Sequence, residues 1–189
     1  MPAEHSYVPR MAAPLMTADE LLYTNVPNKR TELVHGRLVV HEPPGGRHGN
    51  VTANLGGRLW AHVDLTGAGV VFVGDTGFWL TRNPDTVRGP DIAFVRKERA
   101  PAPIPNTFLE FAPDLVVEVL SHNDRPGELL AKIGDWLEAG ARLVWVIDPE
   151  RRIARVYRPD GTEQLLNETD GLDGEDVLPG FRCELRSIL

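Results

Sequence analysis

The stretch GPDIAFV at residues 89–95 decides how this chain is interpreted, together with DLVVEVL at residues 114–120. Both stretches contain short apolar runs with β-branched side chains, bounded by proline or polar residues, a pattern typical of buried strands. Each run nevertheless carries an acid, Asp91 at the start of the first and Glu118 inside the second. A buried ionised carboxylate is costly unless something compensates it. Two acids on neighbouring strands therefore predict a site for a divalent cation.

The segments around these two runs predict a mixed α/β domain. Apolar positions recur at helical spacing from about 48 to 65 and from about 125 to 139. Thr17 and Glu20 have the spacing of a capping box at the start of a short helix. Further strands are expected at 70–73, 77–80, 142–147 and 153–157, and a tight hairpin is expected to join 32–34 to 37–40.

The chain has 189 residues, which is typical of one domain, and we expect it to span 17–189 behind a loose arm at 1–16. Cys183 is the only cysteine, which excludes an intramolecular disulfide and a cysteine-rich zinc site. The start has no apolar core of a signal peptide, and no stretch approaches the roughly 20 apolar residues of a membrane span. We therefore expect a cytoplasmic protein without membrane contact.

The formal net charge is −7, which argues against a passive nucleic-acid binder with a basic surface. No basic residue lies between Arg158 and Arg182, and residues 160–176 supply seven acids, which equal the whole net charge. We expect a solvated acidic loop there, with autoinhibition or the docking of a partner as alternatives.

Lys132 is the candidate cation for the predicted acidic site. Lysine is rare in this chain, with three residues against seventeen arginines. On a helical wheel Lys132 falls at the edge of the apolar stripe, beside Leu129 and Trp136. Its stem can therefore lie along the core while the ammonium reaches a polar pocket. The alternative is a border lysine that only covers apolar surface.

Taken in order, GPDIAFV at 89–95, PDLVVEVLS at 113–121, Lys132 and VWVIDP at 144–149 resemble the Uma-type restriction endonuclease family of the PD-(D/E)XK nuclease superfamily. The likeness runs from about residue 17 to LPGF at 178–181. It implies a restriction-endonuclease-like core, with a mixed β-sheet flanked by α-helices. It also implies a Mg²⁺-dependent DNA endonuclease, with Mn²⁺ as a substitute for Mg²⁺.

The resemblance assigns Asp91 and Glu118 to the Mg²⁺ ion, with the backbone carbonyl of Val119 as a third protein ligand. The superfamily usually places its lysine two residues after the second acid, where this chain has Leu120. The Uma-type family moves the lysine to the next helix, and Lys132 matches that position. The chain departs from the family at His122, where proline is frequent, and at Trp136, where tyrosine is common.

Three further positions match the family, each with an alternative role. Glu32 corresponds to an early acidic position and either touches the metal or its waters, as part of the catalytic set, or supports the hairpin. Arg88 either contacts a substrate phosphate or forms a surface salt bridge. His48 resembles a recurrent histidine, and it either binds substrate or takes a helix-capping or packing role.

The main hypothesis is thus a metal-dependent DNA endonuclease. Its rival is a non-catalytic binding or assembly module with the same fold, suggested by the acidic charge and the lack of an obvious basic stripe. The retained Asp91, Glu118 and Lys132 argue against the rival. Cutting both strands of a duplex is simplest for a symmetric pair of active sites, which suggests a homodimer.

Overall fold

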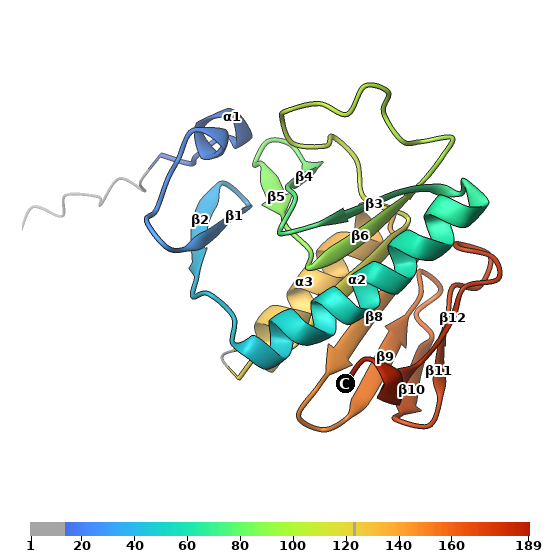
Figure 1. The fold of residues 1–189 in the computed structure, drawn as a ribbon. Helices are drawn as coiled ribbons and strands as arrows, with labels where there is room; N and C mark the ends of the chain where they lie inside the picture. Colours follow the sequence, from blue (N-terminus) through green and yellow to red (C-terminus); the bar gives the residue numbers. More distant parts are fainter. Residues whose placement is uncertain (1–13, 123) are drawn as a thin grey trace, which may run out of the picture.

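The computed structural model describes residues 14–122 and 124–189, and it places them in a mixed α/β fold, as the sequence predicts (Figure 1). Of the predicted arm, residues 1–13 lie outside the described residues. Met16 belongs to the folded part, because its backbone N–H donates to the carbonyl of Gly36 at 2.8 Å. Within the described residues, no helix is long and apolar enough to cross a membrane.

The largest sheet has six strands in the order β10-β9-β8-β7-β6-β3, with β7 and β8 parallel and the other neighbours antiparallel. Its strands are β3 (Gly69–Val73), β6 (Ile92–Arg96), β7 (Leu115–Val119), β8 (Leu143–Asp148), β9 (Ile153–Tyr157) and β10 (Glu163–Asn167). The two acid-bearing runs thus form adjacent central strands, as predicted.

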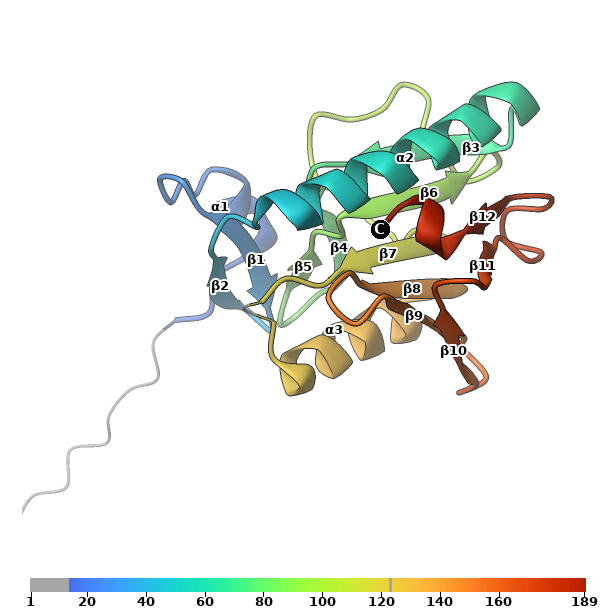
Figure 2. The same cartoon turned by 60° about the horizontal axis from the view of Figure 1, so that its bottom comes forward.

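Two long helices cover opposite faces of this sheet, α2 (Gly46–Thr66) and α3 (Pro126–Glu138) (Figure 2). The alternation of β7 decides which side chain meets which helix. Val117 and Val119 face the core under α2, which also includes the C-terminal strands β11 (Gly171–Asp173) and β12 (Arg182–Glu184). Val116 faces the core under α3. By the same alternation, Glu118 points to the α3 side.

A smaller sheet of order β2-β1-β5-β4 carries α1 (Ala18–Leu22) against it. Its strands are β1 (Arg30–Val34), β2 (Arg37–His41), β4 (Phe78–Thr81) and β5 (Thr86–Arg88). The predicted hairpin is confirmed, because Val34 pairs with Arg37 and Gly36 has a φ of 72°. The capping box of Thr17 and Glu20 is also confirmed. The short strand β5 was not predicted.

The segment 160–176 is largely exposed to solvent, as expected, but the prediction that it is a loop is wrong. This segment contains β10 and β11, and β10 extends the central sheet beside β9. Five of its acids form ion pairs with arginines elsewhere in the chain: Glu163 with Arg155, Glu168 with Arg152, Asp173 with Arg182, Glu175 with Arg158 and Asp176 with Arg142. The acids are therefore part of the folded surface.

Candidate active site

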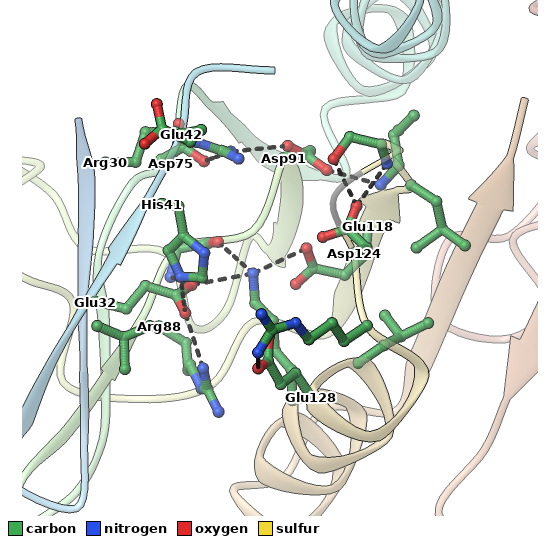
Figure 3. A pocket seen from close by; sticks show the side chains of 18 of the residues that line it. Arg30, Glu32, His41, Glu42, Asp75, Arg88, Asp91, Glu118, Asp124 and Glu128 are labelled. Carbon is green, nitrogen blue, oxygen red and sulfur yellow. Dashed lines mark hydrogen bonds and ion pairs between the residues drawn. The ribbon is translucent and has the colours of Figure 1, made fainter. Parts of the chain in front are cut away.

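The register of β6 and β7 brings the two predicted metal ligands together. Ile92 pairs with Val117, so the preceding residue, Asp91, lies opposite Glu118. Residues opposite each other on antiparallel strands project from the same face. Asp91 Oδ2 also accepts the backbone N–H of Val119 at 2.7 Å. Both carboxylates line one pocket, and Figure 3 shows them there.

Lys132 reaches these acids from the second turn of α3. Its Nζ lies 3.0 Å from Glu118 Oε2, 3.0 Å from Glu32 Oε1 and 2.9 Å from the carbonyl oxygen of Gly89. An ammonium group has three protons to donate. Two of these contacts, to Glu118 and to the Gly89 carbonyl, are hydrogen bonds, and the third, to Glu32, is an ion pair; the side chain keeps only 18% of its exposure. The lysine is therefore held inside the pocket.

Glu32 projects from β1 into the same network, and its two oxygens accept from several donors. Besides Lys132, it contacts Arg88 Nη1 at 2.8 Å and the backbone N–H of Gly89 at 3.0 Å, and His41 Nε2 lies 3.3 Å away. Only 4% of Glu32 is exposed. Its position connects the hairpin sheet to the pocket, so it does more than support the hairpin.

Arg88 is a buried link between β5 and α3. Its Nη1 donates to Glu32, while Nε and Nη2 donate to Asp135 Oδ2 at 2.8 and 2.6 Å. Arg88 forms salt bridges, as one of its two expected roles requires, but it is 6% exposed, so these pairs are buried and not at the surface. All three guanidinium nitrogens contact carboxylates, which fixes α3 relative to β1.

His48 lies at the third position of α2, and its Nε2 is 3.0 Å from Asp91 Oδ1. The capping interpretation is wrong, because the N-cap is Gly45 and no side chain caps this helix. Arg30 approaches the same acid, with Nη1 3.6 Å from Asp91 Oδ1 and 2.8 Å from Asp75 Oδ1. Asp91 Oδ2 therefore accepts a backbone hydrogen bond, while Oδ1 lies near His48 and, at a longer distance, Arg30.

The network of ion pairs contains more acids than permanent cations. Its carboxylates are Glu32, Asp75, Asp91, Glu118 and Asp135, and its permanent cations are Arg30, Arg88 and Lys132. Two negative charges remain unbalanced when every acid is ionised and His41 and His48 are neutral. This imbalance equals the charge of one divalent cation.

The two glutamates that contact Lys132 differ in acidity. Burial, together with repulsion from Asp91 and Glu32, raises the pKa of Glu118 to about 7 against the attraction of Lys132. Burial acts on Glu32 in the same direction, but Lys132, His41 and Arg88 hold its pKa well below the ordinary value. Burial lowers the pKa of Lys132, but the surrounding carboxylates outweigh it and raise that pKa. Of the two glutamates, Glu118 is thus the one whose negative charge is less compensated.

The pocket has a volume of about 650 Å³ and lies where the hairpin β1–β2 faces the N-terminal turns of α2 and α3. Carboxylate and carbonyl oxygens are the ligands that Mg²⁺ prefers, and Mg²⁺ typically takes one or two carboxylates and keeps several waters. Across 14–122 and 124–189, no group of three or more His, Cys, Asp or Glu side chains is arranged to hold a metal. The pair of Asp91 and Glu118 suits an ion that keeps water ligands.

Four members of the network were not predicted from sequence: Arg30, His41, Asp75 and Asp135. Two had a usable signal, because Arg30 lies two residues from Glu32 on one strand and Asp135 lies one turn from Lys132. Asp75 follows β3 in a turn, lines the pocket and pairs with Arg30, which no local pattern indicates.

Comparisons with known proteins found a family and a similar structure. The model of a family described as "Putative restriction endonuclease" matches residues 18–186. The structure is similar to that of "a putative nuclease belonging to DUF820" from Anabaena variabilis ATCC 29413, with a TM-score of 0.81 and 19% sequence identity. The match covers 92% of this chain and 97% of that one, and at this identity it establishes the fold. No curated protein matched the chain.

Proposed function

This chain belongs to the Uma2 family of putative restriction endonucleases, and from that premise we propose that it is a metal-dependent DNA endonuclease acting at Asp91, Glu118 and Lys132. The family and the shared fold support a nuclease-like function. The proposal of a metal-dependent site at these residues rests on the pair of opposed acids, Asp91 and Glu118, beside a buried lysine. A structural core has no need for this arrangement.

The proposed metal ligands are carboxylate oxygens of Asp91 and Glu118, with the carbonyl of Val119 as a third protein ligand. Mg²⁺ is the proposed cofactor, and Mn²⁺ is expected to substitute for it. When bound, the ion would lower the pKa of a water molecule and polarise the scissile phosphate. The unbalanced charge of the network and the raised pKa of Glu118 both support a cation here.

Lys132 is proposed to orient the attacking water and to offset charge in the transition state. In the structure its ammonium contacts Glu118, Glu32 and the Gly89 carbonyl, so one contact has to be exchanged before it can act on a water molecule. The exchangeable partner is Glu118, because its Oε2 would bind the cation. Glu32 and the Gly89 carbonyl then keep the ammonium in place, and the low pKa of Glu32 keeps this acid ionised for the task.

Arg88 and His48 are proposed to position the acids. Arg88 ties Glu32 to α3 through Asp135, and its engaged guanidinium favours this role over direct contact with a phosphate. His48 contacts Asp91 Oδ1 while the Val119 N–H holds Oδ2, so the pair orients this carboxylate. Cleavage of both strands of a duplex would be served by a homodimer.

Nicking of supercoiled plasmid tests the proposal. Wild type is expected to nick in Mg²⁺ or Mn²⁺ and to stop in EDTA, and Asp91→Asn is expected to be at least about 1,000-fold slower because it removes a ligand charge. Asp176→Asn is the matched control, since this exposed acid pairs with Arg142 far from the pocket. Equal rates for Asp91→Asn and wild type would refute the site. No cleavage by wild type of single- or double-stranded DNA would favour the non-catalytic module.

A further inference from the structure

Glu118 has a second donor on α3 that is neutral and fully buried. The indole Nε1–H of Trp136 donates to Glu118 Oε1 at 2.9 Å, while Lys132 contacts Oε2 at 3.0 Å. Lys132 and Trp136 lie four residues apart and therefore on one face of the helix. The helix thus presents a charged donor to one carboxylate oxygen and a neutral donor to the other.

The direction of the Trp136 N–H is set by the core. The side chain is 0% exposed, and its ring meets Phe78 edge to face at a centroid distance of 6.1 Å. Val116 and Val144 of the central sheet belong to the same cluster. An indole offers one donor and no acceptor. Trp136 therefore holds an oxygen at one place and cannot follow the carboxylate if it turns.

The two donors to Glu118 differ in whether they have another acceptor when the contact is broken. Lys132 keeps Glu32 and the Gly89 carbonyl when it releases Oε2, whereas the buried indole has no other acceptor within the described hydrogen bonds. The terminal torsion of a glutamate is soft, so an unanchored carboxylate samples many rotations. An anchor on Oε1 leaves Oε2 directed into the pocket beside Asp91.

Trp145 provides an internal comparison. It is also 0% exposed and packs in the core on the opposite face of the sheet, stacked on Phe181. In the part of the chain that the structure describes, its buried Nε1 has no hydrogen-bond partner. A tryptophan can thus fill a core of this protein without bonding its N–H, so packing alone does not explain the contact between Trp136 and Glu118.

We infer that Trp136 is a positioning residue that orients Glu118 so that Oε2 faces the metal site. This inference rests on the proposed function, because it assigns the Glu118 carboxylate to a divalent cation. Partners that orient a ligand typically change metal affinity or activity by about 10- to 100-fold when they are removed. We expect an effect of that size on Mg²⁺ binding.

Trp136→Phe and Trp145→Phe form a matched pair, because both replace a fully buried indole by a smaller ring. Mg²⁺ affinity, measured by calorimetry and by the rise in melting temperature, is expected to fall about 10- to 100-fold in Trp136→Phe and to stay at the wild-type value in Trp145→Phe. The nicking rate at limiting Mg²⁺ is expected to follow the affinity. Far-UV circular dichroism establishes that each variant is folded.

A second readout is a spectroscopic signature measured on the wild-type protein, in which variants serve only to assign resonances. The ¹⁵N–¹H resonance of the Trp136 indole is expected to shift on addition of Mg²⁺, because its acceptor changes charge environment. The Trp79 indole donates to the carbonyl of Thr81 at the surface and is expected to stay unshifted. Variants with Trp136 or Trp79 replaced by Phe identify the two resonances.

Three outcomes separate the claims. Weaker Mg²⁺ binding in Trp136→Phe alone, with a Mg²⁺-dependent shift of its indole, supports the inference. Equal affinities in the matched pair, or an unshifted Trp136 indole in a wild type that binds Mg²⁺, overturn the inference and leave the proposed function standing. A wild type that does not bind Mg²⁺ overturns both.

Discussion

The acids of residues 160–176 and the acids around Lys132 are compensated in different ways. In the C-terminal segment, five acids each meet an arginine of their own at the surface. In the pocket, the carboxylates of Glu32 and Glu118 share one lysine, and Asp91 lies beside them without a full partner. The negative charge of residues 160–176 is therefore largely compensated by arginines, whereas the negative charge of the pocket is not.

This difference shows that the placement of charge, rather than its amount, indicates function. Exposed ion pairs contribute about 0–1 kcal/mol each, because water already solvates both partners. Buried and incompletely paired acids are costly, so a protein that retains them gains something else. Substitutions in the two regions should therefore have unequal consequences.

The largest effect is expected at Lys132. Lys132→Ala should lower the rate of Mg²⁺-dependent nicking by about 10²- to 10⁴-fold, as for a positioned catalytic group. Lys132→Arg should also fail, because the guanidinium differs in reach and hydration. DNA affinity, measured by gel shift, should change little, since the ammonium acts on the water and the transition state.

Lys97→Arg is the control for the Lys132 variants, because Lys97 is exposed and lies after β6, outside the pocket lining. It should nick like wild type. If Lys132→Ala nicked at the same rate as Lys97→Arg, the lysine would have no part in the mechanism.

The next largest effect is expected at Arg88. Arg88→Met removes the shared partner of Glu32 and Asp135 and leaves carboxylates without compensation, so the free energy of unfolding should fall by about 3–5 kcal/mol. Urea denaturation measures this. Arg155→Met, at a surface pair with 44% exposure of the arginine, is the matched substitution. Similar losses for both variants would contradict the contrast between the regions.

A smaller effect is expected from pH in metal-free buffer. Glu118 has a folded pKa of about 7, above the ordinary 4.5, so the folded state retains a proton that the unfolded chain has lost. Stability should therefore fall as pH rises from about 4.5 to 7, by at most about 3 kcal/mol from this group. Glu32 has the opposite sign: its depressed pKa contributes stability that is present above 4.5 and lost at lower pH.

Thermal melts in EDTA at pH 5 and pH 7.5 test the Glu118 effect. Wild type should lose more stability over this interval than Glu118→Gln, which does not titrate at that position. Added Mg²⁺ should stabilise wild type more at pH 7.5 than at pH 5. Identical pH profiles for wild type and Glu118→Gln would show that this acid is already compensated.

The smallest effect is expected at the surface pairs. Arg142→Ala breaks the contact with Asp176, which is 74% exposed, and should change the free energy of unfolding by less than about 1 kcal/mol. The nicking rate should stay at the wild-type value. The small difference in the free energy of unfolding between Arg142→Ala and wild type should decrease in high salt, because exposed charges are screened. A loss above this range would mean that the segment supports the fold more strongly than its exposure indicates.

Much of the fold could be predicted because its signals are local. The periodicity of 48–65 and 125–139 gave both long helices, and the apolar runs around Asp91 and Glu118 gave two central strands. The shared position of Asp91, Glu118 and Lys132 in one pocket could also be anticipated, since acids in buried strands are unusual and the helix after β7 places Lys132 on the same side of the sheet.

The missed features depend on contacts between distant parts of the chain. Residues 160–176 read as a loop because their arginine partners lie outside the segment, mostly on strands and turns before it. The hydrogen bonds of Arg88 to Asp135 join residues 47 positions apart, and the contact of His48 with Asp91 depends on where α2 lies against the sheet. Contacts between residues so far apart leave no recognisable pattern in the sequence.

The central claim is that Asp91 and Glu118 share one divalent cation within reach of Lys132. Anomalous diffraction from crystals soaked in Mn²⁺ tests it most directly. We predict one peak at about 2.0–2.3 Å from a carboxylate oxygen of each acid, with the Lys132 ammonium one water away. A Mn²⁺ peak bound elsewhere, for example at Asp75, or no peak in the pocket, would contradict the account.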